Sequence, residues 1–272
     1  MRSPRENEQL PKVRAYDLLY INHLSPGQRC EPFHVVDHHT GNSSSNRFVK
    51  RDLIIFDCDG VLVDSELLSC KALTVCLRRH GIDISLDAAI DIFLGRSTQA
   101  VTEYCARRGR RLPDDFFDDL RLAVRAAFTD TLQPTPGIAA VLRTLRTPFC
   151  VASSSDLDRI DHCLRLTGLA ELIGRQIFSA SMVANGKPAP DLFLHAAGAM
   201  RAAPDKTLVV EDSVSGVQAG KAAGMTVWGF VGGSHYASRD GRALLAAAGA
   251  DRIFDRMSDF DHGAAELIDG PL

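Results

Sequence analysis

The 272-residue sequence lacks the long apolar segments that mark membrane and secreted proteins. No apolar run approaches the ~18 consecutive residues that a membrane-spanning helix needs. The N-terminal residues have no continuous apolar stretch behind their positive charges, so we expect no secretory signal. Hydrophobic residues nevertheless make up 45% of the chain and charged residues 24%, which is ordinary for a globular protein. This composition excludes a disordered chain, a coiled coil and a collagen-like fibre.

Neither sign of charge is in large excess, and the cysteines show no pairing pattern. Lys and Arg number 31 against 34 Asp and Glu, a net charge of −3. That balance does not favour broad nucleic-acid binding, so we expect neither a nucleic-acid nor a membrane partner. The 7 cysteines include no Cys-x-x-Cys pair, and the odd count does not indicate a disulfide framework. We therefore expect reduced thiols in a cytoplasmic protein.

The first 48 residues differ from the remainder of the chain. They are polar, and they end near the run Gly-Asn-Ser-Ser-Ser-Asn at 41–46. Such a composition predicts a flexible tail. Translation from a codon other than Met near Val49 is the alternative, and it would leave this segment out of the product.

Short apolar runs alternate with helical patterns from Leu53 onward. Runs of this kind are typical of strands buried on both faces of a parallel sheet. The stronger runs lie at 53–56, 149–152, 207–210 and 225–228, and weaker ones at 176–178 and 252–254. Helical periodicity occurs at 138–145, 157–167, 191–200 and 214–223. The alternation predicts an α/β fold with a doubly wound, Rossmann-like parallel sheet.

The stretch 67–132 interrupts this alternation. It has helical patterns at about 67–80, 86–93, 97–108 and 114–130, and no convincing strand. We therefore predict a helical cap subdomain over 67–132, inserted into a core formed by 49–66 and 133–272. The insert follows the first strand, so it is expected over the carboxyl edge of the sheet, where open α/β sheets bind ligands.

Two carboxylates directly follow the first predicted strand, in the sequence Asp57-Cys58-Asp59-Gly60. In an extended chain residues i and i+2 point the same way, so Asp57 and Asp59 should share one side. Two unpaired carboxylates this close repel each other unless a cation lies near them. Mg²⁺ prefers such oxygen ligands, and the pair therefore suggests a magnesium site.

Polar residues at three later positions could complete such a site. Ser153 and Ser154 follow the second predicted strand, where hydroxyl and backbone N–H groups suit a phosphate. Lys187 lies between Gly186 and Pro188, in a stiff loop where its cation could neutralise a phosphate or a carboxylate. Another carboxylate pair, Glu211-Asp212, follows the strand at 207–210 and should approach Asp57 in the fold.

These four motifs, in this order after successive strands, resemble the haloacid dehalogenase-like superfamily, in its phosphatase and phosphoglucomutase branch. The resemblance covers about residues 52–232, and the insert at 67–132 resembles the four-helix cap of that branch. It implies that Asp57 is the nucleophile and Asp59 the general acid and base. It also implies that Ser153 and the Ser154 backbone hold the phosphoryl oxygens and that Lys187 is a neutralising cation. Mg²⁺ would be held by Asp57, the Asp59 carbonyl, Asp212 and Glu211.

The resemblance implies an Mg²⁺-dependent phosphatase that forms an aspartyl-phosphate. Its expected partner is a small phosphorylated metabolite, a sugar phosphate or sugar-acid phosphate, with Arg96 of the cap loop reading the non-phosphate end. A β-phosphoglucomutase is the alternative, although that group has a His where this chain has Ser69 and a cap Arg two places from Arg96. A receiver-like module that accepts phosphate without turnover is a remote alternative. The sequence leaves the oligomeric state open.

Overall fold

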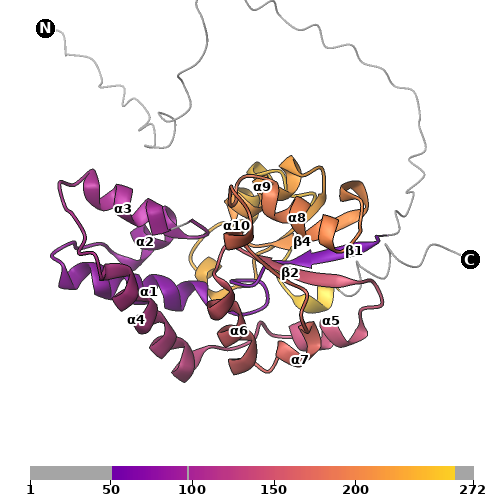
Figure 1. Cartoon of the computed structure of the whole chain (residues 1–272), viewed down its shortest axis with the longest axis horizontal. Coiled ribbons are helices and arrows are strands. Elements are labelled where there is room, and N and C mark those ends of the chain that lie inside the picture. Colours follow the sequence, from indigo (N-terminus) through magenta and orange to yellow (C-terminus); the bar gives the residue numbers. More distant parts are fainter. Residues whose placement is uncertain (1–50, 97, 261–272) are drawn as a thin grey trace, which may run out of the picture. The chain divides into compact units, whose positions relative to one another are not determined.

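The computed structural model describes residues 51–96 and 98–260 (Figure 1). The described strands form one six-stranded sheet in the order β3-β2-β1-β4-β5-β6, and every neighbouring pair is parallel. Their bounds are β1 Leu53–Phe56, β2 Phe149–Ser153, β3 Ile177–Ser179, β4 Thr207–Glu211, β5 Thr226–Phe230 and β6 Arg252–Phe254. The predicted doubly wound parallel sheet is confirmed.

Helices cover both faces of this sheet. On one face, Ile54 and Phe56 of β1 pack with α5, α6 and α7; on the other, Leu53 and Ile55 pack with α8, α9 and α10 (Figure 1). The bounds are α5 Ile138–Thr144, α6 Leu157–Leu166, α7 Ala170–Ile173, α8 Asp191–Ala199, α9 Val214–Ala222 and α10 Gly241–Ala247. Because β1 is buried on both sides, its sequence is a continuous apolar run rather than an alternating one.

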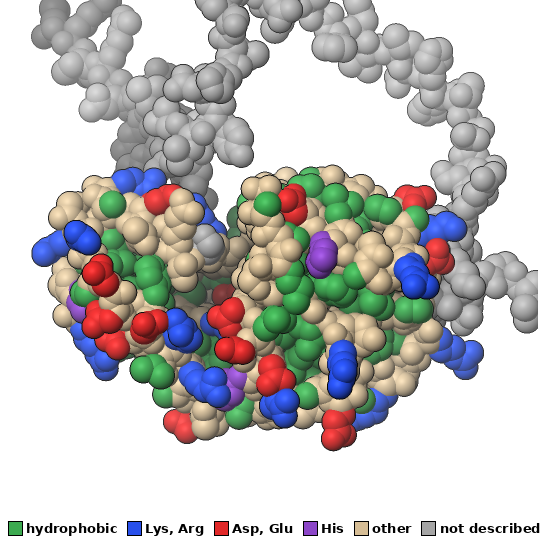
Figure 2. Space-filling view, in the orientation of Figure 1, with side chains coloured by type: hydrophobic (Ala, Val, Ile, Leu, Met, Phe, Trp, Pro, Cys, Tyr) green, Lys and Arg blue, Asp and Glu red, His purple; other side chains and the backbone are tan. Residues whose placement is uncertain are grey.

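The insert between β1 and α5 is helical, as predicted. Its helices are α1 Glu66–Arg79, α2 Leu86–Phe93, α3 Thr98–Ala106 and α4 Phe116–Thr131. They enclose an apolar cluster of their own, which includes Leu77, Phe93 and Phe116. The segments that lead into and out of the insert lie side by side, and the Asp64 backbone N–H donates to the Gln133 carbonyl at 3.1 Å. Figure 2 shows the insert and the sheet region as two lobes with a hollow between them on this face.

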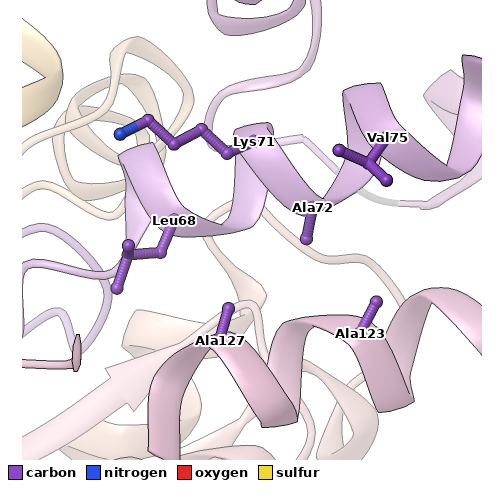
Figure 3. Close-up of a pocket in the computed structure, with 6 residues that line it drawn as sticks. All are labelled: Leu68, Lys71, Ala72, Val75, Ala123 and Ala127. Carbon is purple, nitrogen blue, oxygen red and sulfur yellow. The ribbon is translucent and has the colours of Figure 1, made fainter. Parts of the chain in front are cut away.

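An apolar groove of about 260 Å³ lies between α1 and α4 of the insert (Figure 3). Ala72 of α1 faces Ala123 and Ala127 of α4 across it, and the amine of Lys71 points away from α4. None of the side chains that line it carries a carboxylate or belongs to the predicted site. The groove is therefore a feature of helix packing, separate from the acidic residues at the sheet edge.

The structure differs from the sequence expectation in its shorter elements. The helices α7 and α10 were not expected, and the 3₁₀ segments such as η3, Ser234–Tyr236, were not expected either. The proposed tail, 1–48, lies outside the described residues, so it and the domain boundaries stay predictions. Within residues 51–96 and 98–260, no helix is long and apolar enough to cross a membrane.

Candidate active site

The predicted site residues converge at the carboxyl ends of three neighbouring strands. Asp57 follows β1, Ser153 ends β2, and Glu211 ends β4. All three are buried, with Asp57 6% exposed and Glu211 0% exposed. Adjacent parallel strands end at the same edge of the sheet, so three segments far apart in sequence deliver polar side chains to one place.

Lys187 connects two of these strands through its ammonium group. Lys187 Nζ donates to Asp57 Oδ1 at 2.7 Å, to Glu211 Oε1 at 2.6 Å and to the Ala152 carbonyl at 3.1 Å. Although burial alone would lower it, the two carboxylates raise the pKa of the Lys187 ammonium. Its side chain is 2% exposed, so it is a fixed charge between β1 and β4. This agrees with the predicted placement of a cation beside Asp57.

Both carboxylate oxygens of Glu211 accept hydrogen bonds. Oε1 accepts from Lys187, while Oε2 accepts from the Ser213 backbone N–H at 2.8 Å and the Ser213 hydroxyl at 2.9 Å. A side chain at position 216 would overlap this carboxylate, so Gly216 leaves the room that Glu211 needs. Glu211 is therefore held in one orientation that faces Lys187.

Asp212 is a buried carboxylate with an oxygen that no hydrogen bond satisfies among the described residues. His235 Nε2 lies 3.2 Å from Asp212 Oδ2, but the geometry is not that of a hydrogen bond. Burial lowers the pKa of His235 to about 4, so the ring is neutral at pH 7 and offers no positive charge. Gly60, at φ +77, leaves the space for this oxygen, since a Cβ there would overlap it. An orphaned buried oxygen of this kind needs an explanation.

Three carboxylates are gathered tightly enough to hold one metal ion. Oxygens of Asp57, Glu211 and Asp212 all lie within 4.8 Å of one another. Burial, followed by the neighbouring carboxylates, raises the pKa of Asp212, and burial raises the pKa of Asp57 despite Lys187. Against three buried carboxylates the cluster has one cation, so a divalent cation would balance the charge. Oxygen donors of this charge suit Mg²⁺.

Asp59 faces away from this cluster toward a second set of partners. Its Oδ1 accepts from Ser65 Oγ and Arg159 Nη2, both at 2.6 Å. Its Oδ2 accepts from Ser155 Oγ at 2.6 Å and Ser153 Oγ at 3.4 Å. Although burial opposes the effect, the Arg159 guanidinium lowers the pKa of Asp59 to about 2. Each of the two carboxylates therefore has a cation beside it, Lys187 at Asp57 and Arg159 at Asp59, and the Asp59 carboxylate lies outside the three-carboxylate cluster.

Two predicted residues are not brought into contact with the cluster. Ser154 is exposed, while its neighbour Ser153 is buried. Arg96 is exposed three residues after the end of α2, and its Nη1 donates to the Ile92 carbonyl of that helix at 3.4 Å. Ser97, in the same predicted cap loop, lies outside the described residues. The substrate roles of Ser154 and Arg96 stay predictions.

Several residues at the site were not anticipated from the sequence. Arg159 lies in the first turn of α6, and Glu66 is the first residue of α1. Burial, then the Asp59 carboxylate, raises the pKa of Glu66 to about 7. Both residues lie in the first turn of the helix that follows a motif-bearing strand, and that position was the available signal. Ser65, the N-cap residue of α1, donates its hydroxyl to Asp59 and makes no side-chain cap bond.

The insert and the core touch near the start of α9. Ser215 Oγ donates to the Gly95 carbonyl at 2.9 Å, and Arg239 Nη2 pairs with Asp91 Oδ1 at 2.5 Å. A Cβ at Gly95 would lie 2.7 Å from Ser213 Cβ, so this loop of the insert packs directly against the segment that follows the Glu211-Asp212 pair. The contact places the predicted cap loop beside the acidic cluster.

Comparison with known proteins agrees with this arrangement. Residues 51–224 match a hydrolase family described as haloacid dehalogenase-like hydrolase. The chain is similar to a 6-phosphogluconate phosphatase of Escherichia coli (strain K12), 28% identical over 186 residues, which are 68% of this chain and 84% of the relative. It is also similar to the fructose-1-phosphate phosphatase YqaB of that strain, 31% identical over 176 residues, or 63% and 92% of the two chains. A solved HAD family hydrolase from Deinococcus radiodurans R1, with bound phosphate and sodium, matches with a TM-score of 0.67 and 36% identity, covering 80% of this chain and 97% of that chain.

The family match spans well over half of the sequence and includes all four motifs at the sheet edge. The chain belongs to the haloacid dehalogenase-like hydrolase family, as a hydrolase of phosphoric monoesters. The receiver-like alternative is therefore excluded.

Proposed function

We propose that this protein is an Mg²⁺-dependent phosphatase that hydrolyses a small phosphorylated sugar or sugar acid through an aspartyl-phosphate. One observation carries the proposal: the buried Asp57 carboxylate, paired with Lys187, lies within a three-carboxylate cluster at the carboxyl edge of the sheet. A carboxylate can approach a phosphate dianion only where cations offset the repulsion between them. The phosphatases among the relatives support the same reaction class.

In the first step, an oxygen of Asp57 attacks phosphorus and a new Asp57–O–P bond forms. The bond between phosphorus and the ester oxygen of the substrate breaks. Because Arg159 lowers the pKa of Asp59 to about 2, Asp59 is a carboxylate in the free protein, so it takes up a proton from solvent as the substrate binds and gives that proton to the leaving oxygen. Lys187 stays bound to Asp57 and offsets the charge of the incoming phosphate. The products are the free alcohol and a phosphorylated Asp57.

In the second step, a water oxygen attacks the same phosphorus atom. Asp59, again a carboxylate, takes a proton from this water and returns it to solvent, so the resting carboxylate is restored. The Asp57–O–P bond breaks, which regenerates the Asp57 carboxylate and releases inorganic phosphate. The Ser153 hydroxyl and the Ser154 backbone N–H are assigned to the phosphoryl oxygens during both steps.

The residues present fit a magnesium ion. Asp57 and Asp212 would hold it, together with the Asp59 backbone carbonyl and, directly or through water, Glu211. Both Glu211 oxygens already accept hydrogen bonds, which favours contact through water. When bound, Mg²⁺ supplies positive charge that stabilises the transferring phosphoryl group.

The substrate class is proposed from the insert and from the relatives. The loop at 93–96 packs against the core beside the acidic cluster, so it is positioned to meet the end of the substrate that carries no phosphate. Arg96 in that loop would pair with a carboxylate or a hydroxyl of a sugar. The named relatives act on 6-phosphogluconate and fructose 1-phosphate, which have such groups.

Release of inorganic phosphate from a panel of sugar and sugar-acid phosphates tests the proposal. The assay is run with Mg²⁺ and with EDTA, on the wild type and on Asp57→Asn. Asp52→Asn is the matched control, because Asp52 is an exposed carboxylate just before the opposite end of the same strand. We expect Mg²⁺-dependent release that Asp57→Asn abolishes and Asp52→Asn leaves unchanged.

Two other results would change the conclusion. Interconversion of hexose 1- and 6-phosphates without release of phosphate would favour the β-phosphoglucomutase alternative. Release that persists in Asp57→Asn would show that a different group attacks phosphorus.

A further inference from the structure

Within residues 51–96 and 98–260, Arg159 is the charged group that joins Asp59 to the helical insert. Its Nη2 donates to Asp59 Oδ1 at 2.6 Å and to Ser69 Oγ of α1 at 3.1 Å. Its guanidinium also lies over the Phe128 ring of α4, 4.9 Å from the ring centroid. The side chain is 26% exposed, whereas Arg165, one turn and a half further along α6, is 72% exposed and pairs only with Asp161 of its own helix.

The four donors to Asp59 are not chemically equivalent. Ser65, Ser153 and Ser155 contribute hydroxyl groups, which can turn from donor to acceptor when the carboxyl carries a proton. A guanidinium has donors only, so Arg159 cannot reverse its bond. Oδ1 is therefore committed to Arg159, while both donors to Oδ2 are hydroxyls that can reverse.

We propose that Arg159 is a positioning residue for the reaction: it fixes Asp59 through Oδ1, so that Oδ2 is the oxygen that exchanges a proton with the substrate. This inference rests on the proposed function. Oδ2 is the oxygen beside Ser153, the residue assigned to the phosphoryl group, at 3.4 Å. Without Arg159 the carboxyl can rotate, and Oδ2 loses its fixed direction toward the leaving oxygen.

The contacts to α1 and α4 make this orientation depend on the insert. Ser69 and Phe128 both belong to the insert, and the guanidinium lies between them and Asp59. Ser69 stands where the phosphoglucomutase branch has a histidine, and in this chain its hydroxyl is taken by Arg159. The position of the insert and the direction of the Asp59 carboxyl are thus joined through one side chain.

The nature of the leaving group provides a test that a general structural defect would not mimic. An alkyl phosphate needs a proton on its leaving oxygen, whereas p-nitrophenolate leaves as a stable anion without one. The ratio kcat/KM reports the steps up to departure of this group, so it does not contain the later hydrolysis of the aspartyl-phosphate. Loss of Asp59 orientation should therefore lower kcat/KM for the alkyl ester far more than for the aryl ester.

The experiment compares kcat/KM for the best alkyl phosphate of the panel and for p-nitrophenyl phosphate, with Mg²⁺ present. In Arg159→Met we expect a loss of ~100-fold for the alkyl ester and less than ~5-fold for the aryl ester. Asp59→Asn should show the same selectivity, and the double variant should be no worse than Asp59→Asn alone. Arg165→Met, which removes an arginine from the same helix, should match the wild type.

Arg159→Lys is a second variant that keeps the inference testable if Arg159→Met does not fold. Lysine keeps the positive charge but is a point charge without the planar fork of donors that arginine has. We expect it to fall between the wild type and Arg159→Met, with the same preference for the aryl ester. Equal losses for both esters, or no loss, in the two Arg159 variants would overturn the inference while leaving the phosphatase proposal intact. Absence of phosphatase activity in the wild type would instead overturn the proposed function itself.

Discussion

Asp57 and Asp59 are two residues apart, yet their carboxylates have different partners. Asp57 faces Lys187 and the acidic cluster, and Asp59 faces Arg159 and three serine hydroxyls. The turn at Gly60, whose φ is +77, follows directly after them. This separation lets one carboxylate attack while the other exchanges protons, because their surroundings differ in charge.

Replacement of Gly60 by alanine should damage the site at its closest contact. The new Cβ would overlap the Asp212 carboxylate, and a non-glycine residue at positive φ costs about 1–2 kcal/mol. We expect phosphatase activity to fall at least ~100-fold through the displaced carboxylate. Steady-state kinetics and thermal unfolding measure the two effects separately.

Gly109→Ala is the matched control for this prediction. Gly109 has φ +67, but nothing lies within 4 Å of its would-be Cβ. It should lose a similar amount of stability and keep full activity. Equal activity in both variants would show that Asp212 does not need its present position.

At this scale, sequence reasoning found the residues that stand next to strand ends and missed those that reach in from helices. Asp57, Ser153 and Glu211 each adjoin or end an apolar run, so their convergence could be predicted from strand order. The guanidinium of Arg159 reaches Asp59 across 100 residues of sequence. That contact depends on how α6 packs against the sheet, and no local pattern encodes it.

The longer helices could be predicted because their helical periodicity of apolar residues extends over several turns. The helices α1 and α4 have 14 and 16 residues, and both were expected within two residues of their observed bounds. By contrast, α7 has 4 residues, which is too short for helical periodicity to emerge, and α10 was missed although α5, also of 7 residues, was predicted. Gly216 and Gly220 allow close packing of α9, whereas Gly224 lies beyond the helix end at φ +73.

Two glycine-to-alanine substitutions in helices should have opposite effects on stability. Gly220 of α9 is buried, and a Cβ there would lie 2.6 Å from Val227 Cγ2 of β5, so Gly220→Ala should destabilise by about 1–3 kcal/mol. Gly198 of α8 is exposed with nothing within 4 Å, so Gly198→Ala should stabilise by about 0.5–1 kcal/mol. Denaturant unfolding measures both, and a stabilising Gly220→Ala would contradict the close approach of α9 to the sheet.

Burial of three carboxylates at the carboxyl edge of the sheet costs the folded protein electrostatic free energy. Asp57, Glu211 and Asp212 are buried together, and Lys187 is the cation that contacts two of them. Burial raises the pKa of Asp57 and of Asp212, so the folded protein retains protons that the unfolded chain gives up. A bound divalent cation would replace those protons, so folding stability should depend on both metal binding and pH.

In the metal-free protein, the two raised carboxyl pKa values make folding stability depend on pH. A carboxyl whose pKa is raised on folding makes stability fall as pH rises, by up to about 1.4 kcal/mol per pH unit for each retained proton. His235 acts oppositely, since its pKa is lowered to about 4, but it is neutral in both states above pH 7. With EDTA, we therefore expect Asp57 and Asp212 to make Tm fall as pH rises above the pKa that these carboxyls have in the unfolded chain.

Mg²⁺ should raise Tm by an increment that grows with pH over the same range, because ion binding displaces protons from the cluster. Asp212→Asn removes one raised carboxyl, so it should reduce both the slope in EDTA and the increment with Mg²⁺. Asp161→Asn, an exposed carboxyl on α6, should leave both unchanged. A pH-independent Tm in EDTA would mean that the folded protein keeps all three carboxylates ionised. The retention of protons by Asp57 and Asp212 would then be contradicted, and the excess of carboxylate charge over Lys187 would remain as the argument for magnesium.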